Sequence, residues 1–131
     1  MSYIYSEVDS LDNTAKVCNK QCVALVQYYA KASVILQWKE GEIVFGASNI
    51  AKGTAIATFI NGKYPNLRHG NHAALYISQD ASGIYVMDQW LDDKTKPKVS
   101  RRYIRRKGKK SDGSFVDPSN NAEAFSVIER K

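Results

Sequence analysis

Cysteines are scarce in this sequence: Cys18 and Cys22 are the only two among 131 residues. So few cysteines exclude the disulfide framework that holds many small secreted proteins together. A single bridge between the two is also disfavoured, because cysteines four residues apart on a helix have poor disulfide geometry. We therefore expect a hydrophobic core, rather than disulfides, to stabilise the chain.

Long apolar runs are absent as well. No stretch approaches the ~18 apolar residues that cross a bilayer, so no transmembrane segment is predicted. The first seven residues have neither the basic start nor the apolar stretch of a secretory signal. We expect a protein that is made in the cytoplasm and either stays there or leaves by a route that reads no N-terminal peptide. A signal that is missing from this sequence is the third alternative.

Composition is otherwise ordinary, with 44% hydrophobic and 24% charged residues, as in soluble globular proteins. The chain has no internal repeat. Its length suits one domain over residues 1–131, which can bury a core of its own.

The net charge of +6 is distributed unevenly. Residues 92–110 contain ten lysines and arginines and two aspartates, a net charge of +8, so the other 112 residues sum to −2. Such a segment fits either an anionic partner (nucleic acid, an acidic cell-wall polymer or a membrane face) or a solvated loop. Nucleic acid is disfavoured, because Tyr103 is the only aromatic residue of the segment. For an anionic polymer, the expected contacts are Arg101, Arg102, Arg105 and Arg106.

The expected elements are a helix followed by strands. Apolar residues on nearly every side predict a buried helix from about residue 21 to 33, with Asn19 as its N-cap. Residues 1–18 and 107–121 are expected to be irregular, and a short piece at 34–38 leads into a turn around Gly41. Small and β-branched residues between turn signals predict strands at 54–60, 72–77, 84–89, 99–104 and 124–128. A helix followed by an antiparallel meander indicates an α+β fold.

Cys22 is the first candidate for chemistry, because it falls in the first turn of the expected helix. Unpaired backbone N–H groups there stabilise negative charge, so they lower the pKa of a thiol and can also hold an oxyanion. The alternative is a small cysteine that only packs. Gln21, just before it, either donates its amide to an oxyanion or simply occupies the helix start.

His72 is the candidate base for that thiol. It opens a strand, which fixes the orientation of an imidazole better than the glycine-flanked loop that holds His69. A histidine without a task, at the surface or in the core, is the alternative.

Asp88 is the candidate third member. If strands 72–77 and 84–89 pair with residue 76 opposite residue 84, then His72 lies opposite Asp88, and opposed Cβ atoms are about 5 Å apart. A carboxylate at that distance can orient the imidazole. A slip of one residue would place Gln89 there instead, and an aspartate that caps a strand end is the other alternative.

A metal site is a weaker interpretation. Cys18, Cys22, His69 and His72 contain sulfur and imidazole ligands, but their C-x₃-C and H-x₂-H spacings do not match common zinc sites. No metal and no other cofactor is predicted.

The order of these motifs resembles the NlpC-type papain-like cysteine peptidases of bacterial cell walls, and most of all the small amidase effectors of type VI secretion systems. The stretches that carry the resemblance are Gln21–Gln27, Gly53–Phe59, Gly70–Ile77 and Asp88–Trp90. It covers residues 21 to 90. Two features differ: Gln21 and Val23 replace the acidic and small residues that usually flank the nucleophile, and the third position is commonly histidine.

The resemblance implies a papain-like fold, with the helix that carries the nucleophile packed on an antiparallel sheet or small barrel. It implies cleavage of an amide bond in the peptide stems of peptidoglycan, with Cys22 as nucleophile, His72 as base and acid, and Asp88 as orienting residue; Gln21 and Gln89 are candidates for oxyanion or substrate contacts. An exported antibacterial amidase that acts in the periplasm of a target cell implies a dedicated inhibitor protein in its producer. A cysteine hydrolase of protein amides and a basic module that binds anionic polymer are the alternatives.

Overall fold

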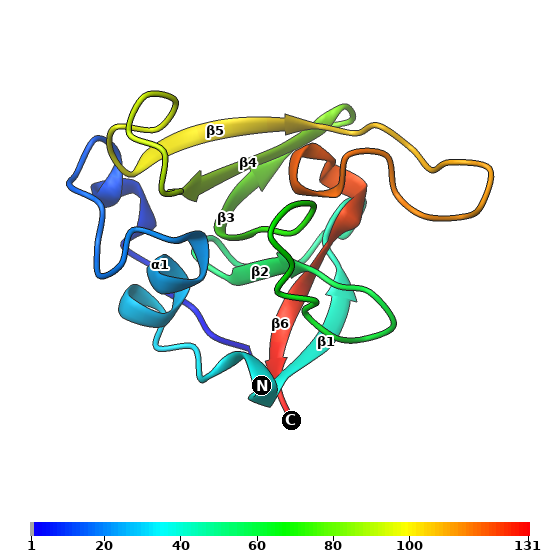
Figure 1. The fold of residues 1–131 in the computed structure, drawn as a ribbon, viewed down its shortest axis with the longest axis horizontal. Helices are drawn as coiled ribbons and strands as arrows, with labels where there is room; N and C mark the ends of the chain where they lie inside the picture. The colour runs from blue at the N-terminus through cyan, green and yellow to red at the C-terminus, as the bar shows by residue number, and fades with distance from the viewer. Residues whose placement is uncertain (1) are drawn as a thin grey trace.

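The computed structural model describes residues 2–131, which form one α-helix, α1, packed against an antiparallel sheet (Figure 1). The strand order is β1-β6-β2-β3-β4-β5, so β1 and β5 are the two edges and the sheet is open rather than a closed barrel. The α+β fold class is therefore confirmed. The bounds are α1 Cys22–Tyr29, β1 Trp38–Ile43, β2 Ala55–Thr58, β3 Ala73–Gln79, β4 Gly83–Asp88, β5 Ser100–Arg105 and β6 Phe125–Arg130, with short 3-10 helices at Val8–Leu11, Ile35–Gln37, Pro118–Asn120 and Ala122–Ala124.

Helix α1 is shorter at both ends than its apolar pattern indicates. An N-cap at Asn19 would make Lys20 and Gln21 helical, but neither is. Lys20 has a left-handed backbone (φ 69°), and Gln21 is itself the N-cap. The Asn19 side chain accepts a hydrogen bond from the Gln21 N–H at 3.0 Å, outside the helix. Left-handed Lys31 (φ 62°) follows the other end. The helix therefore begins at Cys22, and the thiol is still in its first turn.

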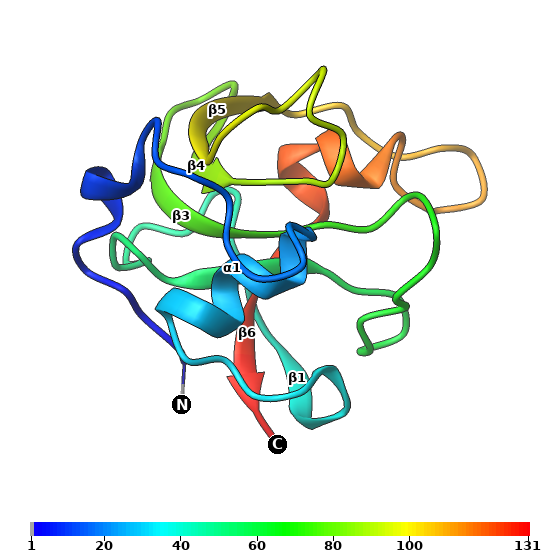
Figure 2. The ribbon, with the colours of Figure 1, turned by 60° about the vertical axis from the view of Figure 1, so that its left-hand side comes forward.

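The helix packs on one face of the sheet because that face is lined with small residues. Ala55, Ala57 and Ala73 are fully buried, and they share one hydrophobic cluster with Leu25 and Val26 of α1. Small side chains let a helix approach a sheet closely. Figure 2 shows α1 lying in front of β3 and β2. This contact brings the start of α1 close to the start of β3.

The opposite face of the sheet carries a second cluster around Ile56, Ala74 and Phe125. The N-terminal arm is largely irregular as expected, but it belongs to the core: Tyr3, Val8 and Leu11 are buried, and Tyr3 joins the cluster beneath α1. None of the helices in residues 2–131 is long and apolar enough to cross a membrane.

The main difference between the structure and the sequence-based prediction is strand β1. The turn expected around Gly41 is absent, and Gly41 lies inside β1, which pairs with β6 at the sheet edge. A Cβ atom at this glycine would lie 2.6 Å from the side chain of Glu129 on β6, so the glycine allows close strand contact. The sequence signal was ambiguous because a strand glycine and a turn glycine look alike.

The register of β3 and β4 also differs from the expectation. Tyr76 pairs with Val86, not with residue 84, and a bulge lies between Tyr76 and Ser78. The difference at this end of the pair is two residues. Because side chains alternate with a period of two, such a shift leaves the residues on this side of the bulge on their expected faces. His72 and Asp88 therefore remain on one face as diagonal rather than directly opposed neighbours.

Candidate active site

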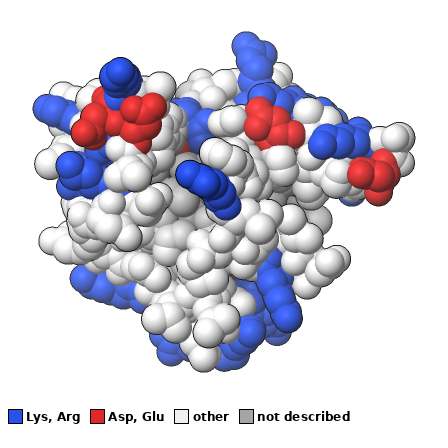
Figure 3. Space-filling model, viewed as in Figure 1, with Lys and Arg blue, Asp and Glu red and all other residues white. Residues whose placement is uncertain are grey.

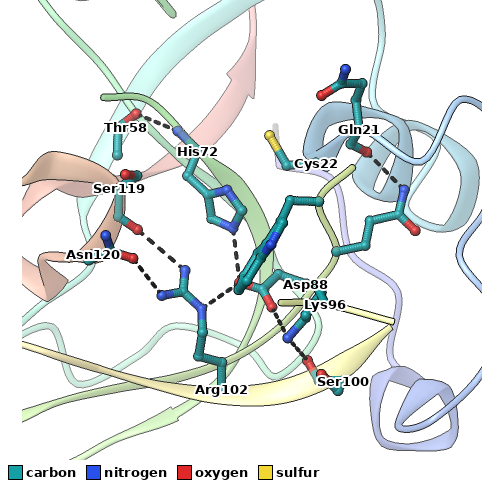
Figure 4. Close-up of polar contacts among 12 residues, drawn as sticks. Gln21, Cys22, Thr58, His72, Asp88, Lys96, Ser100, Arg102, Ser119 and Asn120 are labelled. Carbon is teal, nitrogen blue, oxygen red and sulfur yellow. Dashed lines mark hydrogen bonds and ion pairs between the residues drawn. The ribbon is translucent and has the colours of Figure 1, made fainter. Parts of the chain in front are cut away.

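The three candidate residues come together where the start of α1 meets the end of the sheet. Cys22 is the first residue of the helix and is partly exposed. His72 immediately precedes β3, and Asp88 is the last residue of β4. In the close-up, the imidazole lies between the thiol and the carboxylate (Figure 4).

His72 is held by both its backbone and its ring. Its N–H donates to the Thr58 hydroxyl, and its carbonyl accepts from the Thr58 N–H, both at 3.0 Å. The ring Nε2 lies 2.9 Å from Oδ2 of Asp88. The other ring nitrogen, Nδ1, is the one left on the side of Cys22 (Figure 4). Because Asp88 occupies Nε2, Nδ1 is the nitrogen that can exchange a proton with the thiol.

Asp88 is fully buried and has cations on both oxygens. Lys96 Nζ lies 2.7 Å from Oδ1, and Arg102 Nε donates to Oδ2 at 2.9 Å. Arg102 also donates to Oδ1 of Asn120 (2.8 Å) and to the carbonyl of Ser119 (3.3 Å). Two cations stabilise the ionised carboxylate against its burial, and such a site is costly to disrupt because it leaves charges unpaired.

Trp90 lies beside this charged cluster. Lys96 Nζ is 4.8 Å and the Arg102 guanidinium carbon 5.2 Å from the centre of its ring, within cation–π range. The His72 ring lies 6.1 Å from it at a steep angle. The indole N–H donates to the Thr95 hydroxyl at 2.7 Å, which fixes the ring. Trp90 therefore packs against three of the charged or titratable groups of the site.

The electrostatics favour a charged thiol–imidazole pair. Burial by itself raises the pKa of Cys22, but the hydrogen bond and charge of His72, the Ala73 N–H and the Tyr64 hydroxyl lower it, and the net pKa lies below that of an ordinary thiol. Burial also lowers the pKa of His72, but Asp88 and Cys22 raise it to about 9. Both shifts act in the same direction, because each favours the charged form of its group, the thiolate of Cys22 and the imidazolium of His72.

The Asp88 carboxylate stays ionised at neutral pH. Burial raises the pKa of Asp88, but His72, Arg102 and Lys96 outweigh it and hold that pKa well below its usual range. The Tyr64 hydroxyl lies 3.7 Å from Sγ of Cys22. Burial, followed by the charge of Cys22, raises the pKa of Tyr64, so the phenol stays protonated and can donate to the thiolate.

Gln89 anchors the chain before the helix. It is fully buried, and its amide nitrogen donates to the carbonyls of Gln21 (2.8 Å) and Val17 (3.2 Å) while its oxygen accepts from the Val17 N–H (3.0 Å). Both amide hydrogens are used within the chain, so Gln89 has none left to donate to an oxyanion or a substrate. The exposed side chain of Gln21 has no capping bond and lines the cavity beside Cys22.

The basic segment divides between this site and the surface. Arg102, one of the four expected polymer contacts, is instead paired with Asp88 inside the site. Arg101 and Arg105 are exposed over the rings of Tyr85 and Tyr103, and exposed Arg106 pairs with Glu123 at 3.4 Å. Basic side chains are spread over the face in Figure 3 rather than gathered into one patch.

Sequence reasoning missed several residues of the site. Lys96 belongs to the basic run, and nothing in the pattern separates this buried lysine, 5% exposed, from its neighbours in the run. Thr58 and Tyr64 have no local signal at all. Both cysteines are free thiols, and residues 2–131 contain no cluster of three or more His, Cys, Asp or Glu side chains that could hold a metal ion.

Two cavities open at the site. The larger, about 700 Å³, is lined by both Cys22 and His72. The smaller, about 480 Å³, is lined by His72 and Arg102 but not by Cys22. The thiol is therefore reachable by a substrate, although the carboxylate behind it is not.

Known proteins with the same architecture are amidase effectors by name. A solved structure of type 6 secretion amidase effector 2 (Tae2) matches with a TM-score of 0.92 at 49% identity, over 98% of this chain and 95% of that one. The type VI secretion amidase effector 2 protein of Salmonella typhi is 50% identical over 133 residues, 98% of this chain and 100% of that protein. The domesticated amidase effector 2 of Ixodes scapularis is 36% identical over 119 residues, 86% and 73% of the two chains. The model of the family "domesticated amidase effector 2" matches residues 5–128, and this chain belongs to that family.

Proposed function

We propose that this protein is a cysteine amidase that cleaves an amide bond in the peptide stems of peptidoglycan, as an antibacterial effector. Two relatives that match this chain over almost their whole length are named amidase effectors. The observation that carries the chemistry is the imidazole of His72, held by Asp88 at 2.9 Å on one side and interacting with the Cys22 thiol on the other. We also propose that residues 1–131 act as a single domain of the NlpC-type papain-like class.

The mechanism follows from the polarity of the pair. The Cys22 thiolate attacks the carbonyl carbon of the amide, and the negative charge moves to the carbonyl oxygen. Unpaired N–H groups in the first turn of α1 are suited to hold that oxyanion. The imidazolium of His72 then gives its proton to the leaving amine, and a thioester remains.

Hydrolysis completes the cycle. Neutral His72 takes a proton from water, the hydroxide attacks the thioester, and the acid product leaves as the thiolate is restored. Asp88 keeps the same ring orientation in both half-reactions, because its ion pairs with Lys96 and Arg102 do not depend on the substrate. Gln21 lines the cavity beside Cys22 and remains a candidate contact to the substrate.

The biological setting follows from the same proposal. An amidase effector acts outside the cell that makes it, so we propose delivery to the periplasm of a target cell. A producer that carries such an enzyme needs protection, and a dedicated inhibitor protein that covers the Cys22 cavity is the partner we expect.

Digestion of purified cell walls tests this function. Sacculi incubated with the protein are expected to release new free amines and smaller muropeptides, identified by chromatography and mass spectrometry. A panel of folded proteins is expected to show no cleavage or loss of side-chain amides under the same conditions. If the proteins of the panel are cleaved or lose amides while the sacculi stay intact, the substrate is a protein amide and not peptidoglycan.

A further inference from the structure

The two cavities meet at the imidazole and share one wall. Arg68, Asn71, His72 and Trp90 line both of them. Only the larger cavity reaches Cys22, whereas the smaller one extends past His72 toward Arg102. A substrate bound across the site has room on both sides of the bond that is cut.

Amide chemistry assigns the two sides, given the proposed function. The thiolate attacks the carbonyl carbon, so the acyl part of the substrate lies on the Cys22 side. His72 protonates the leaving nitrogen, and general acid catalysis requires hydrogen-bond reach of that atom. The part of the substrate attached to the nitrogen therefore lies on the His72 side, where the smaller cavity of about 480 Å³ can hold it.

The charged side chains that line this smaller cavity indicate which kind of substrate group it binds. Its wall contains two arginines and one carboxylate, Asp117. Asp117 is already paired with Lys107 at 2.9 Å. Every branch of the Arg102 guanidinium is used, by Asp88, Asn120 and Ser119. Arg68, in contrast, is exposed and has no polar partner among residues 2–131.

The backbone around Arg68 is shaped so that this side chain stands at the junction of the cavities. The Asn71 side chain closes the loop, because its oxygen accepts from the Leu67 N–H and its nitrogen donates to the Leu67 carbonyl at 3.1 Å. Asn66 and Gly70, at the two ends of this turn, both have a left-handed backbone (φ 48° and 82°). A guanidinium without a partner, presented by a closed loop beside a polar cavity, matches the planar geometry of a carboxylate.

We propose that the 480 Å³ cavity is the subsite for the amine side of the substrate, and that Arg68 binds a free carboxylate carried by the residue that leaves. This rests on the proposed function and adds a specificity: the enzyme prefers an amide whose nitrogen belongs to a residue with an ionised carboxyl group. The carboxylate would form charge-assisted hydrogen bonds that a neutral carboxamide cannot replace.

Two synthetic stem-peptide dimers test the subsite. They are identical except that the residue on the amine side has a free carboxylate in one and a carboxamide in the other. Binding is measured by calorimetry with the Cys22→Ala protein, which leaves both uncut. The free acid is expected to bind about 10- to 100-fold more tightly, the range of a charged hydrogen-bonded pair. Adding Arg68→Gln should remove the preference by weakening only the free acid, and Arg68→Lys should restore part of it.

A matched control removes a different charge. Lys39 is exposed on β1 and lines neither cavity, so Lys39→Gln should keep the full preference. Equal binding of the two dimers, binding of neither, or a preference that survives Arg68→Gln would overturn the subsite. Failure of the unmodified enzyme to digest sacculi would instead remove the proposed function, so the two failures are distinct.

Discussion

Replacing Cys22 by alanine is expected to lower the rate of muropeptide release on the order of 10,000-fold or more, because no other group of the site can form the thioester. The fold should survive, since Cys22 is partly exposed and its side chain is small. The rate is measured on purified sacculi at neutral pH, and circular dichroism and thermal unfolding report the fold.

Cys18 provides the matched control for this substitution. It is exposed, has a left-handed backbone (φ 55°) and lies four residues before the helix start. Cys18→Ser should retain essentially the parental rate. If the Cys22→Ala protein digests the wall as fast as its parent, the covalent mechanism is wrong, whatever the ancestry of the chain.

Replacing Asp88 by asparagine is expected to damage both activity and stability. The imidazole loses the partner that fixes its tautomer, and a comparable loss in serine hydrolases lowers turnover by about 10,000-fold. Lys96 and Arg102 lose the charge that balances them in a buried site, which costs about 3–5 kcal/mol of unfolding free energy. Urea unfolding at pH 7 and the rate on sacculi measure the two effects.

The pH dependence of the stability difference distinguishes a loss of the Asp88 ion pairs from a loss of packing. The pKa of Asp88 is lowered in the folded protein, so its contribution to stability is present above the ordinary carboxyl pKa and is lost as pH falls below about 4. The stability difference between parent and Asp88→Asn should therefore shrink at acid pH. Exposed Asp93, paired with Lys16 at 2.6 Å, is the control, and Asp93→Asn should change little. A pH-independent difference would mean that the charges of the cluster do not matter.

The sequence was sufficient for the grouping of the site but not for its detailed geometry. His72 and Asp88 were expected to oppose each other, and they do meet, although the register differs by two residues. The grouping was insensitive to that error because a shift of two preserves the face of the sheet. A shift of one would have separated them. The bulge after Tyr76, which sets the real register, has no clear sequence signal.

The start of α1 shows the same division between local and non-local information. An N-terminal position for Cys22 followed from local polar residues, although the N-cap is Gln21 and not Asn19. What holds that start in place is Gln89, which directly follows the end of β4. The cation pair on Asp88 likewise joins residues 88, 96 and 102 through strand pairing and a loop. Contacts of this kind depend on the tertiary fold, so composition alone suggested only a basic surface.

The pH dependence of thiol labelling tests the central claim most directly. In a Cys18→Ser background, the rate of alkylation of Cys22 by iodoacetamide is measured between pH 4 and 10, with and without His72→Gln. The account predicts a midpoint below the ~8.5 of a free thiol, and a midpoint that rises when the imidazole is removed, because the hydrogen bond and charge of His72 then no longer oppose the effect of burial on the thiolate. A midpoint near 8.5 that is the same in both proteins would contradict it.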